Sequence, residues 1–168
     1  MNQDRKGEAR GEFRPTLQGC VSQDLRLARA MEDCYVESMQ AFLAHEYRAT
    51  LLERTVCEAK EQFEALASAE RSHLRLIGEL ILELGGNPCV RASFRIVPIE
   101  LNANGIPTER ALCQTLCEAI AQERRKIDRY QMLMGHTQDR VVRSVLDFLA
   151  SGSHRFLEKL ISLERSMS

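Results

Sequence analysis

Apolar residues recur every three or four positions along four long segments of the chain, the spacing of one face of an α-helix. The segments run from about 24 to 54, 56 to 84, 108 to 134 and 139 to 166. The second ends at Gly85-Gly86-Asn87-Pro88, where glycine can cap a helix and proline cannot continue it. Thr108 is a candidate N-cap for the third. The pattern predicts four helices, each about 40 Å long.

The lengths of the connections between these segments predict how the helices pair. The links near Arg54 and near 135–138 are very short, so each joins neighbouring antiparallel helices. The connection 89–104 is long enough to cross from one hairpin to the other, and 93–98 within it looks extended. We therefore predict an all-α fold, an antiparallel four-helix bundle of two hairpins joined by one long crossover. It would occupy residues 24–168, after a flexible N-terminal leader at 1–23 in which Asp4–Arg14 alternates basic and acidic side chains.

Composition fits one soluble domain and excludes several partners. The 168 residues carry 23 Lys and Arg against 24 Asp and Glu, a net charge of −1. This balance gives no basic footprint for nucleic acid or an anionic membrane. No apolar run approaches the roughly 20 residues that span a bilayer, and the first residues lack the apolar region of a secretory signal. We expect a cytoplasmic protein.

The six cysteines form no C-x-x-C pair and no zinc-ribbon spacing. We expect buried reduced thiols, with Cys113 and Cys117 side by side as small apolar fillers one helical turn apart. Without C-x-x-C pairs the chain carries no rubredoxin-like electron-transfer domain, so a redox role would need an external electron donor. The remaining cysteines are Cys20, Cys34, Cys57 and Cys89.

Three ionisable residues fall on stripes that should be buried. Glu70 and His73 lie in the middle of the apolar stripe of helix 56–84. Glu123 is the only charged residue on the apolar stripe of helix 108–134. Burying an unpaired carboxylate costs several kcal/mol, so the interior needs a compensating cation, a proton or a hydrogen-bond partner. The E-x-x-H spacing places Glu70 and His73 one turn apart, able to share a metal ion. The alternative is a hydrogen-bonded core histidine without metal.

These residues resemble the ferritin-like superfamily, and they are most similar to its bacterioferritin, rubrerythrin and manganese-catalase-like branches. The E-x-x-H of Glu70 and His73 leads through a leucine-rich turn into the Gly-Gly-Asn-Pro motif at 85–88, and Glu123 to Tyr130 fits the E-x6-Y of the third helix. The likeness covers roughly 24–163. It implies a four-helix bundle that holds two iron or manganese ions for ferroxidase, peroxidase or catalase chemistry.

Carried over residue by residue, the ligand set is incomplete. The glutamate of the first helix falls on Gln40, with Tyr47 as its E-x6-Y partner, and the E-x-x-H of the fourth helix falls on Ser153 and Phe156. Substitutes could come from Glu37 or from His154. Ser151 lies three residues before His154, and His45 and Glu46 flank the apolar arc of the first helix and could each contribute a ligand.

Two hypotheses of different kinds follow. In the first, Glu70, His73, Glu123 and Gln40 bind one iron or manganese ion for iron handling or peroxide and oxygen chemistry. Tyr47 and Tyr130 would then donate hydrogen bonds to the metal ligands, and no residue is assigned a catalytic role. In the second, the chain is a metal-free, non-catalytic structural or assembly module derived from a di-metal protein, a role that the resemblance makes plausible because some relatives belong to spore coats and protein shells.

The first helix carries more apolar surface than one bundle face requires. Beside its main stripe, a second one comprises Val36, Leu43, Tyr47 and Leu51. An amphipathic helix shows a single stripe, so the second would be exposed in a monomer. We predict a homodimer formed partly through this helix; the alternative is that the crossover covers the stripe.

Overall fold

A computed structural model of the chain describes residues 17, 21–54, 58–89 and 93–167. These residues form four helices and no strand, with one isolated antiparallel bridge between Leu101 and Pro107. The all-α prediction is confirmed. The helices are α1 (Leu25–Leu51), α2 (Glu58–Glu83), α3 (Glu109–Gly135) and α4 (Arg140–Met167).

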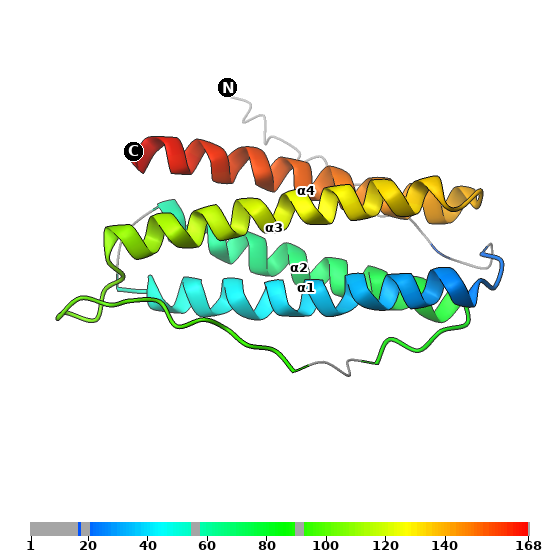
Figure 1. Ribbon diagram of the computed structural model, residues 1–168, viewed down its shortest axis with the longest axis horizontal. Helices are drawn as coiled ribbons and strands as arrows, with labels where there is room; N and C mark the ends of the chain where they lie inside the picture. The colour runs from blue at the N-terminus through cyan, green and yellow to red at the C-terminus, as the bar shows by residue number, and fades with distance from the viewer. Residues whose placement is uncertain (1–16, 18–20, 55–57, 90–92, 168) are drawn as a thin grey trace, which may run out of the picture.

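The helices pack as two antiparallel hairpins, α1 with α2 and α3 with α4, as predicted (Figure 1). The crossover between α2 and α3 runs along the outside of α1 for most of its length (Figure 1). One hydrogen bond joins it to that helix, since the Ile99 amide donates to the Tyr47 hydroxyl at 3.2 Å. The expected pair of helical hairpins joined by one long crossover is the fold observed.

Polar side chains set the starts of three helices. Asp24 Oδ1 accepts from the amides of Arg26 and Leu27 at the start of α1. Thr108 Oγ1 accepts from the Ala111 amide, which confirms it as the N-cap of α3. Asp139 Oδ1 accepts from two amides in the first turn of α4. After α2, Gly85 has a φ of 86°, the left-handed conformation that favours glycine.

Apolar side chains fill the two ends of the bundle as separate clusters. One cluster lies where α1 begins and α2 ends, and includes Met31, Ile77 and Leu146. The other lies where α1 ends and α2 begins, and includes Phe63, Leu116 and Leu160. Leu17, within the expected leader, packs in the first cluster, whereas Asp4–Arg14 lies outside the described residues. Between the two clusters the bundle interior is polar.

The second stripe of α1 is half-buried at all four positions, in part because the crossover lies against Tyr47. The homodimer through this helix stays a prediction. No helix in the described part of the chain is both long and apolar enough to cross a membrane.

Among the four cysteines in the described residues, the prediction of burial is correct for Cys34 alone. Cys89 and Cys117 are exposed and Cys113 is half-buried, so Cys117 is not a core filler. Its thiol points outward and donates to Glu164 Oε1 of α4 at 3.0 Å. Cys20 and Cys57 lie outside the described residues.

Candidate functional site

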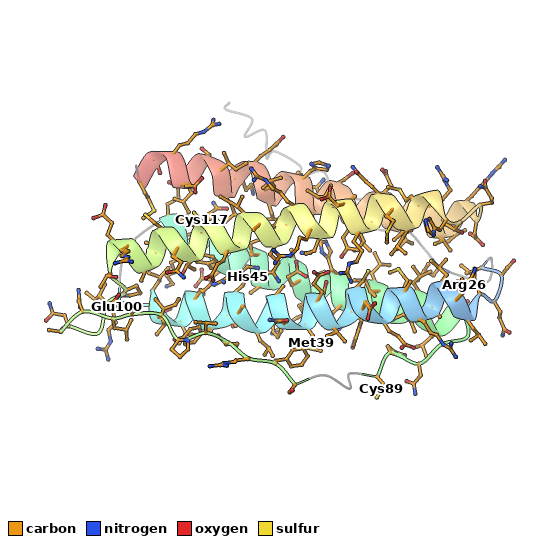
Figure 2. All side chains as sticks on the ribbon, in the orientation of Figure 1. Arg26, Met39, His45, Cys89, Glu100 and Cys117 are labelled. Carbon is orange, nitrogen blue, oxygen red and sulfur yellow. The ribbon has the colours of Figure 1, made fainter. Side chains whose placement is uncertain are left out.

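A layer of buried polar side chains crosses the middle of the bundle, between the two apolar clusters. We call it the central polar layer. Every member is at most 5% exposed, and each helix contributes at least one. Figure 2 shows the His45 position on α1, on the side of the bundle interior. The members are Ser38 and His45 of α1, Glu70 and His73 of α2, Glu123 and Lys126 of α3, and Ser153 of α4.

The ammonium group of Lys126 lies between the two carboxylates of this layer. Lys126 Nζ donates to Glu123 Oε1 at 2.9 Å and also to Glu70 Oε1 on α2. Burial by itself lowers the pKa of Lys126, but the attraction of both carboxylates outweighs it and raises the pKa above its usual range. Lys126 is therefore a protonated cation buried in the bundle centre.

The His73 imidazole stands beside this ion-paired group as a neutral ring. Burial and the positive charge of Lys126 lower the pKa of His73 to about 3. Its Nδ1 lies 4.0 Å from Glu70 Oε1. Space for the ring comes from Gly152 of α4, where a Cβ atom would lie 3.1 Å from His73 Nε2. A glycine of α4, one residue before Ser153, thus faces the imidazole.

His45 is also buried and neutral. Its Nδ1 lies 3.3 Å from a terminal guanidinium nitrogen of Arg48, and its ring stacks on Phe63 with centroids 5.9 Å apart. Burial lowers the pKa of His45 well below its usual value, and the charges of Arg48 and Lys126 lower it further. The sequence placed this residue at the flank of the buried arc; the structure places it inside the layer.

The structure brings together three of the four predicted metal ligands. Glu70, His73 and Glu123 share the central polar layer, whereas Gln40 is exposed on the outer side of α1. Gln40 points away because the inward positions of this helix are Ser38, Ala41 and His45, at spacings of three and four residues.

The two tyrosines predicted beside the site have different positions. Tyr130 is 1% exposed and adjoins the layer, where burial raises the pKa of its hydroxyl, with Lys126 opposing the shift and Glu70 adding to it. Tyr47 instead accepts a hydrogen bond from the crossover.

The proposed substitute ligands do not complete the set. Glu37 forms an ion pair with Arg129 at 3.5 Å, outside the layer. His154, Glu46 and Ser151 are exposed. Ser153 is fully buried in the layer, but a hydroxyl brings no negative charge to a metal ion.

The donor set does not fit a metal ion in this arrangement. The ammonium of Lys126 already binds one oxygen of each carboxylate and stands between them. No group of three or more His, Cys, Asp or Glu side chains in the described ranges is arranged to hold a metal. A divalent cation beside the ammonium would also meet strong repulsion in a medium of low polarity.

Lys126 is the residue that the sequence reasoning missed, although a signal for it was present. The inward positions of α3 alternate at spacings of four and three residues, and Lys126 continues that series between Glu123 and Tyr130. A lysine on a helix usually extends its ammonium into water, so the position alone suggested a surface residue. The members of the series are Leu112, Leu116, Ala119, Glu123, Lys126, Tyr130 and Leu133.

Solved structures with similar folds are ferritin-like proteins. The bacterioferritin BfrA of Mycobacterium tuberculosis superposes with a TM-score of 0.71 at 17% identity, covering 88% of this chain and 89% of that one. A ferritin-like, diiron-carboxylate protein of Bacillus anthracis gives a TM-score of 0.57 at 19% identity, with 86% and 99% covered.

A third similar structure is a two-domain protein of Anabaena variabilis that contains DJ-1/ThiJ/PfpI-like and ferritin-like domains. It gives a TM-score of 0.61 at 16% identity and covers 83% of this chain and 36% of that protein. No protein-family model matches the sequence, and no curated protein matches it significantly. At these identities the likeness establishes the ferritin-like fold.

Proposed function

We propose that this chain is a metal-free, non-catalytic ferritin-like module with a structural or assembly role. The observation that carries the proposal is the position of Lys126, whose ammonium binds Glu70 and Glu123 at the centre of the bundle. The lysine supplies the positive charge that metal ions would supply in a di-metal bundle. The central polar layer then serves to hold α2 and α3 together.

The charges of the central polar layer support the metal-free function. Two divalent ions carry four positive charges, which four carboxylates can balance. The layer holds two carboxylates and one ammonium, and its histidines His45 and His73 are neutral, so its net charge is −1. This is too little negative charge to balance two divalent ions. An ammonium group has three donors and no acceptor, so it is a partner for carboxylates and cannot be a metal ligand while protonated.

A second candidate function is a one-ion site for iron or manganese, used in iron handling or peroxide and oxygen chemistry. Among the described residues, six side-chain atoms of the layer have no hydrogen-bond partner, and three of them favour this function: Glu70 Oε2, Glu123 Oε2 and His73 Nδ1. These are the donor types that iron and manganese accept. Metal binding would require Lys126 to leave the carboxylates, and any redox cycle would need an external electron donor.

Metal analysis of the purified protein separates the two functions. The chain would be expressed in medium supplemented with iron and manganese, purified without chelator and measured beside Glu70→Gln. The metal-free function predicts less than about 0.1 ion per chain in both proteins. One ion per chain in the wild type, lost in Glu70→Gln, would overturn the proposal in favour of the one-ion site.

A lysine variant tests directly whether the Lys126 ammonium keeps metal ions away from Glu70 and Glu123. Lys126→Ala removes the ammonium from the carboxylates and is expected to bind manganese more tightly than the wild type in a calorimetric titration. Lys159→Ala, which removes an exposed lysine of α4, is the matched control and should leave manganese binding unchanged. Peroxide consumption by the manganese-treated wild type should stay at the level of buffer.

A further inference from the structure

A cavity of about 270 Å³ lies between α1, α3 and the crossover, outside the central polar layer. We call it the crossover groove. Its residues come from three separate parts of the chain, so it exists only in the folded bundle. They include Gln40, Tyr47 and Arg48 of α1, Arg95 and Val97 of the crossover, and Arg125 of α3.

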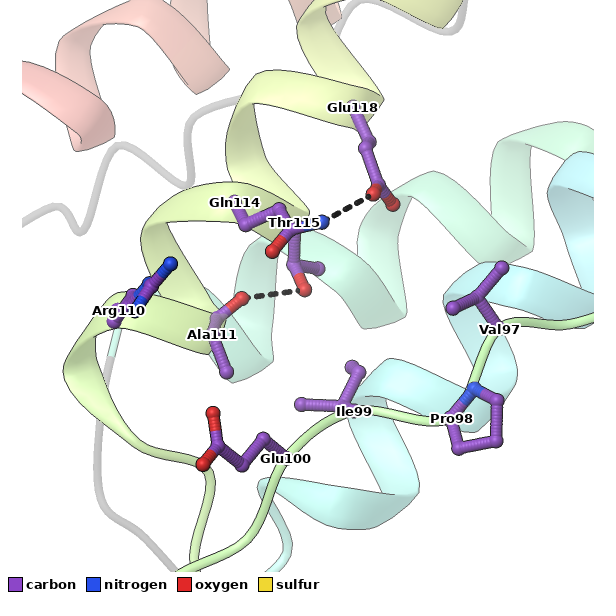
Figure 3. A pocket seen from close by; sticks show the side chains of 9 residues that line it. All are labelled: Val97, Pro98, Ile99, Glu100, Arg110, Ala111, Gln114, Thr115 and Glu118. Carbon is purple, nitrogen blue, oxygen red and sulfur yellow. Dashed lines mark hydrogen bonds between the residues drawn. The ribbon is translucent and has the colours of Figure 1, made fainter.

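A neighbouring cavity of the same volume continues along α3 (Figure 3). Val97, Ile99, Thr115 and Glu118 line both cavities. Figure 3 shows the Ile99 side chain pointing from the crossover toward α3, into the space between α1 and α3. The groove is therefore a space between α1 and α3 that the crossover closes from outside.

The crossover groove contains a buried arginine with unused hydrogen-bonding capacity. Arg48 is 9% exposed, and its guanidinium lies over the Phe63 ring at 5.6 Å. Its polar contacts are long: 3.3 Å to His45 Nδ1 and 3.4 Å to Glu118 Oε2. Guanidinium has five N–H donors in a planar fork that matches a carboxylate, so two long contacts leave donors for a ligand.

Positive charge exceeds negative charge along the walls. The lining carries Arg48, Arg95 and Arg125 against Glu37 and Glu118. Each of these carboxylates has an ion-pair partner, Arg129 for Glu37 and Arg48 for Glu118. In the described part of the chain, no carboxylate lies within 4.0 Å of the guanidinium of Arg95 or Arg125. Two uncompensated guanidinium groups beside a half-enclosed space attract an anion.

The remaining walls indicate what kind of anion fits. The Tyr47 oxygen accepts from Ile99, so its own proton is free to donate. Ala44, Ile96 and Val97 add apolar surface. Ligand sites combine such apolar walls with a few placed polar groups, and 270 Å³ is near the lower end of their size. We propose that the crossover groove binds a small organic carboxylate with a compact apolar body, held by Arg48, Arg95 and Arg125.

Benzoate is the probe for this site, and benzamide, its uncharged counterpart of the same shape, is the control ligand. Binding to the ¹⁵N-labelled full chain would be followed by NMR at constant ionic strength, because salt screens weak charge attraction. We expect saturable shifts of the Tyr47 and Thr115 amides with benzoate and at least about fivefold weaker binding of benzamide.

A charge-matched pair of variants assigns the site. Arg95→Gln/Arg125→Gln should weaken benzoate binding at least about fivefold. Arg29→Gln/Arg124→Gln removes the same charge from exposed positions that do not line the groove and should leave binding unchanged. Equal loss in both variants, equal binding of benzamide, or no saturation by about 50 mM benzoate would each overturn the proposal. None of these outcomes bears on the metal content of the central polar layer.

Discussion

Replacing Lys126 with methionine removes the positive charge of the central polar layer and keeps most of the apolar stem. The perturbation is severe because both partner carboxylates are about 1% exposed, so water cannot replace the ammonium. Removing one partner of a buried ion pair costs about 3–5 kcal/mol in free energy of unfolding. Two carboxylates lose their partner together here, so we expect a loss in the upper half of that range.

Against a typical total stability of about 5–15 kcal/mol, the variant should still fold. For a loss of about 4–5 kcal/mol its Tm should fall by roughly 8–20 °C, using about 2–4 °C per kcal/mol for a chain of this size. The assay is urea unfolding followed by far-UV circular dichroism, with an unchanged m-value as evidence that the unfolding transition is the same.

Two controls isolate the cause of that loss. Arg124→Met, at an exposed position two residues earlier, should change stability by less than about 0.5 kcal/mol. The triple variant Glu70→Gln/Glu123→Gln/Lys126→Met replaces the ion-paired group with neutral side chains and should recover most of the lost stability. A loss below about 1 kcal/mol in Lys126→Met, the value of a surface ion pair, would refute the buried ion-pair reasoning.

Three further predictions address the His73 environment and the assembly state. Because the pKa of His73 is lowered to about 3 in the folded chain, the unfolded chain binds the extra proton below pH 6.5, and stability is lost as the pH falls from 6.5 toward 3. The loss of unfolding free energy attributable to His73 between pH 6.5 and 5 is about 2 kcal/mol. In urea unfolding, the free energy of His73→Gln should therefore decrease less over this pH range than that of the wild type. The control His154→Gln, at an exposed position, should show the same decrease as the wild type. Gly152→Ala should lower the free energy of unfolding, because the new Cβ would lie 3.1 Å from His73 Nε2 and this crowding outweighs the helix-propensity gain of about 1 kcal/mol. In a His73→Ala background, where the ring is absent, the same change should raise the free energy of unfolding. Light scattering at micromolar concentration should give two chains of 19.1 kDa per particle, and a monomer would contradict an interface through α1.

The fold could be read from the sequence because its determinants are local and repeated. The α2 stripe predicted from periodicity, which includes Phe63, Ile77 and Leu84, is buried throughout. Short links force antiparallel neighbours, and the Gly-Gly-Asn-Pro motif at 85–88 and the N-cap Thr108 fall at the two ends of the crossover. Gln40 was expected inside because it occupies the glutamate position of the E-x6-Y motif. It is exposed because the inward face of α1 is formed by Ser38, Ala41 and His45.

By itself the sequence determined the four helices, their pairing and the presence of Glu70, His73 and Glu123 on buried stripes. Only the tertiary structure decided which positive charge lies between the two carboxylates. Lys126 can reach into water or into the core from its position on α3, and the choice depends on Glu70, a residue 56 positions earlier on another helix. The crossover groove has the same origin, because its arginines come from three distant segments. Helical periodicity is a property of neighbouring residues, whereas charge compensation depends on which side chains meet across the bundle.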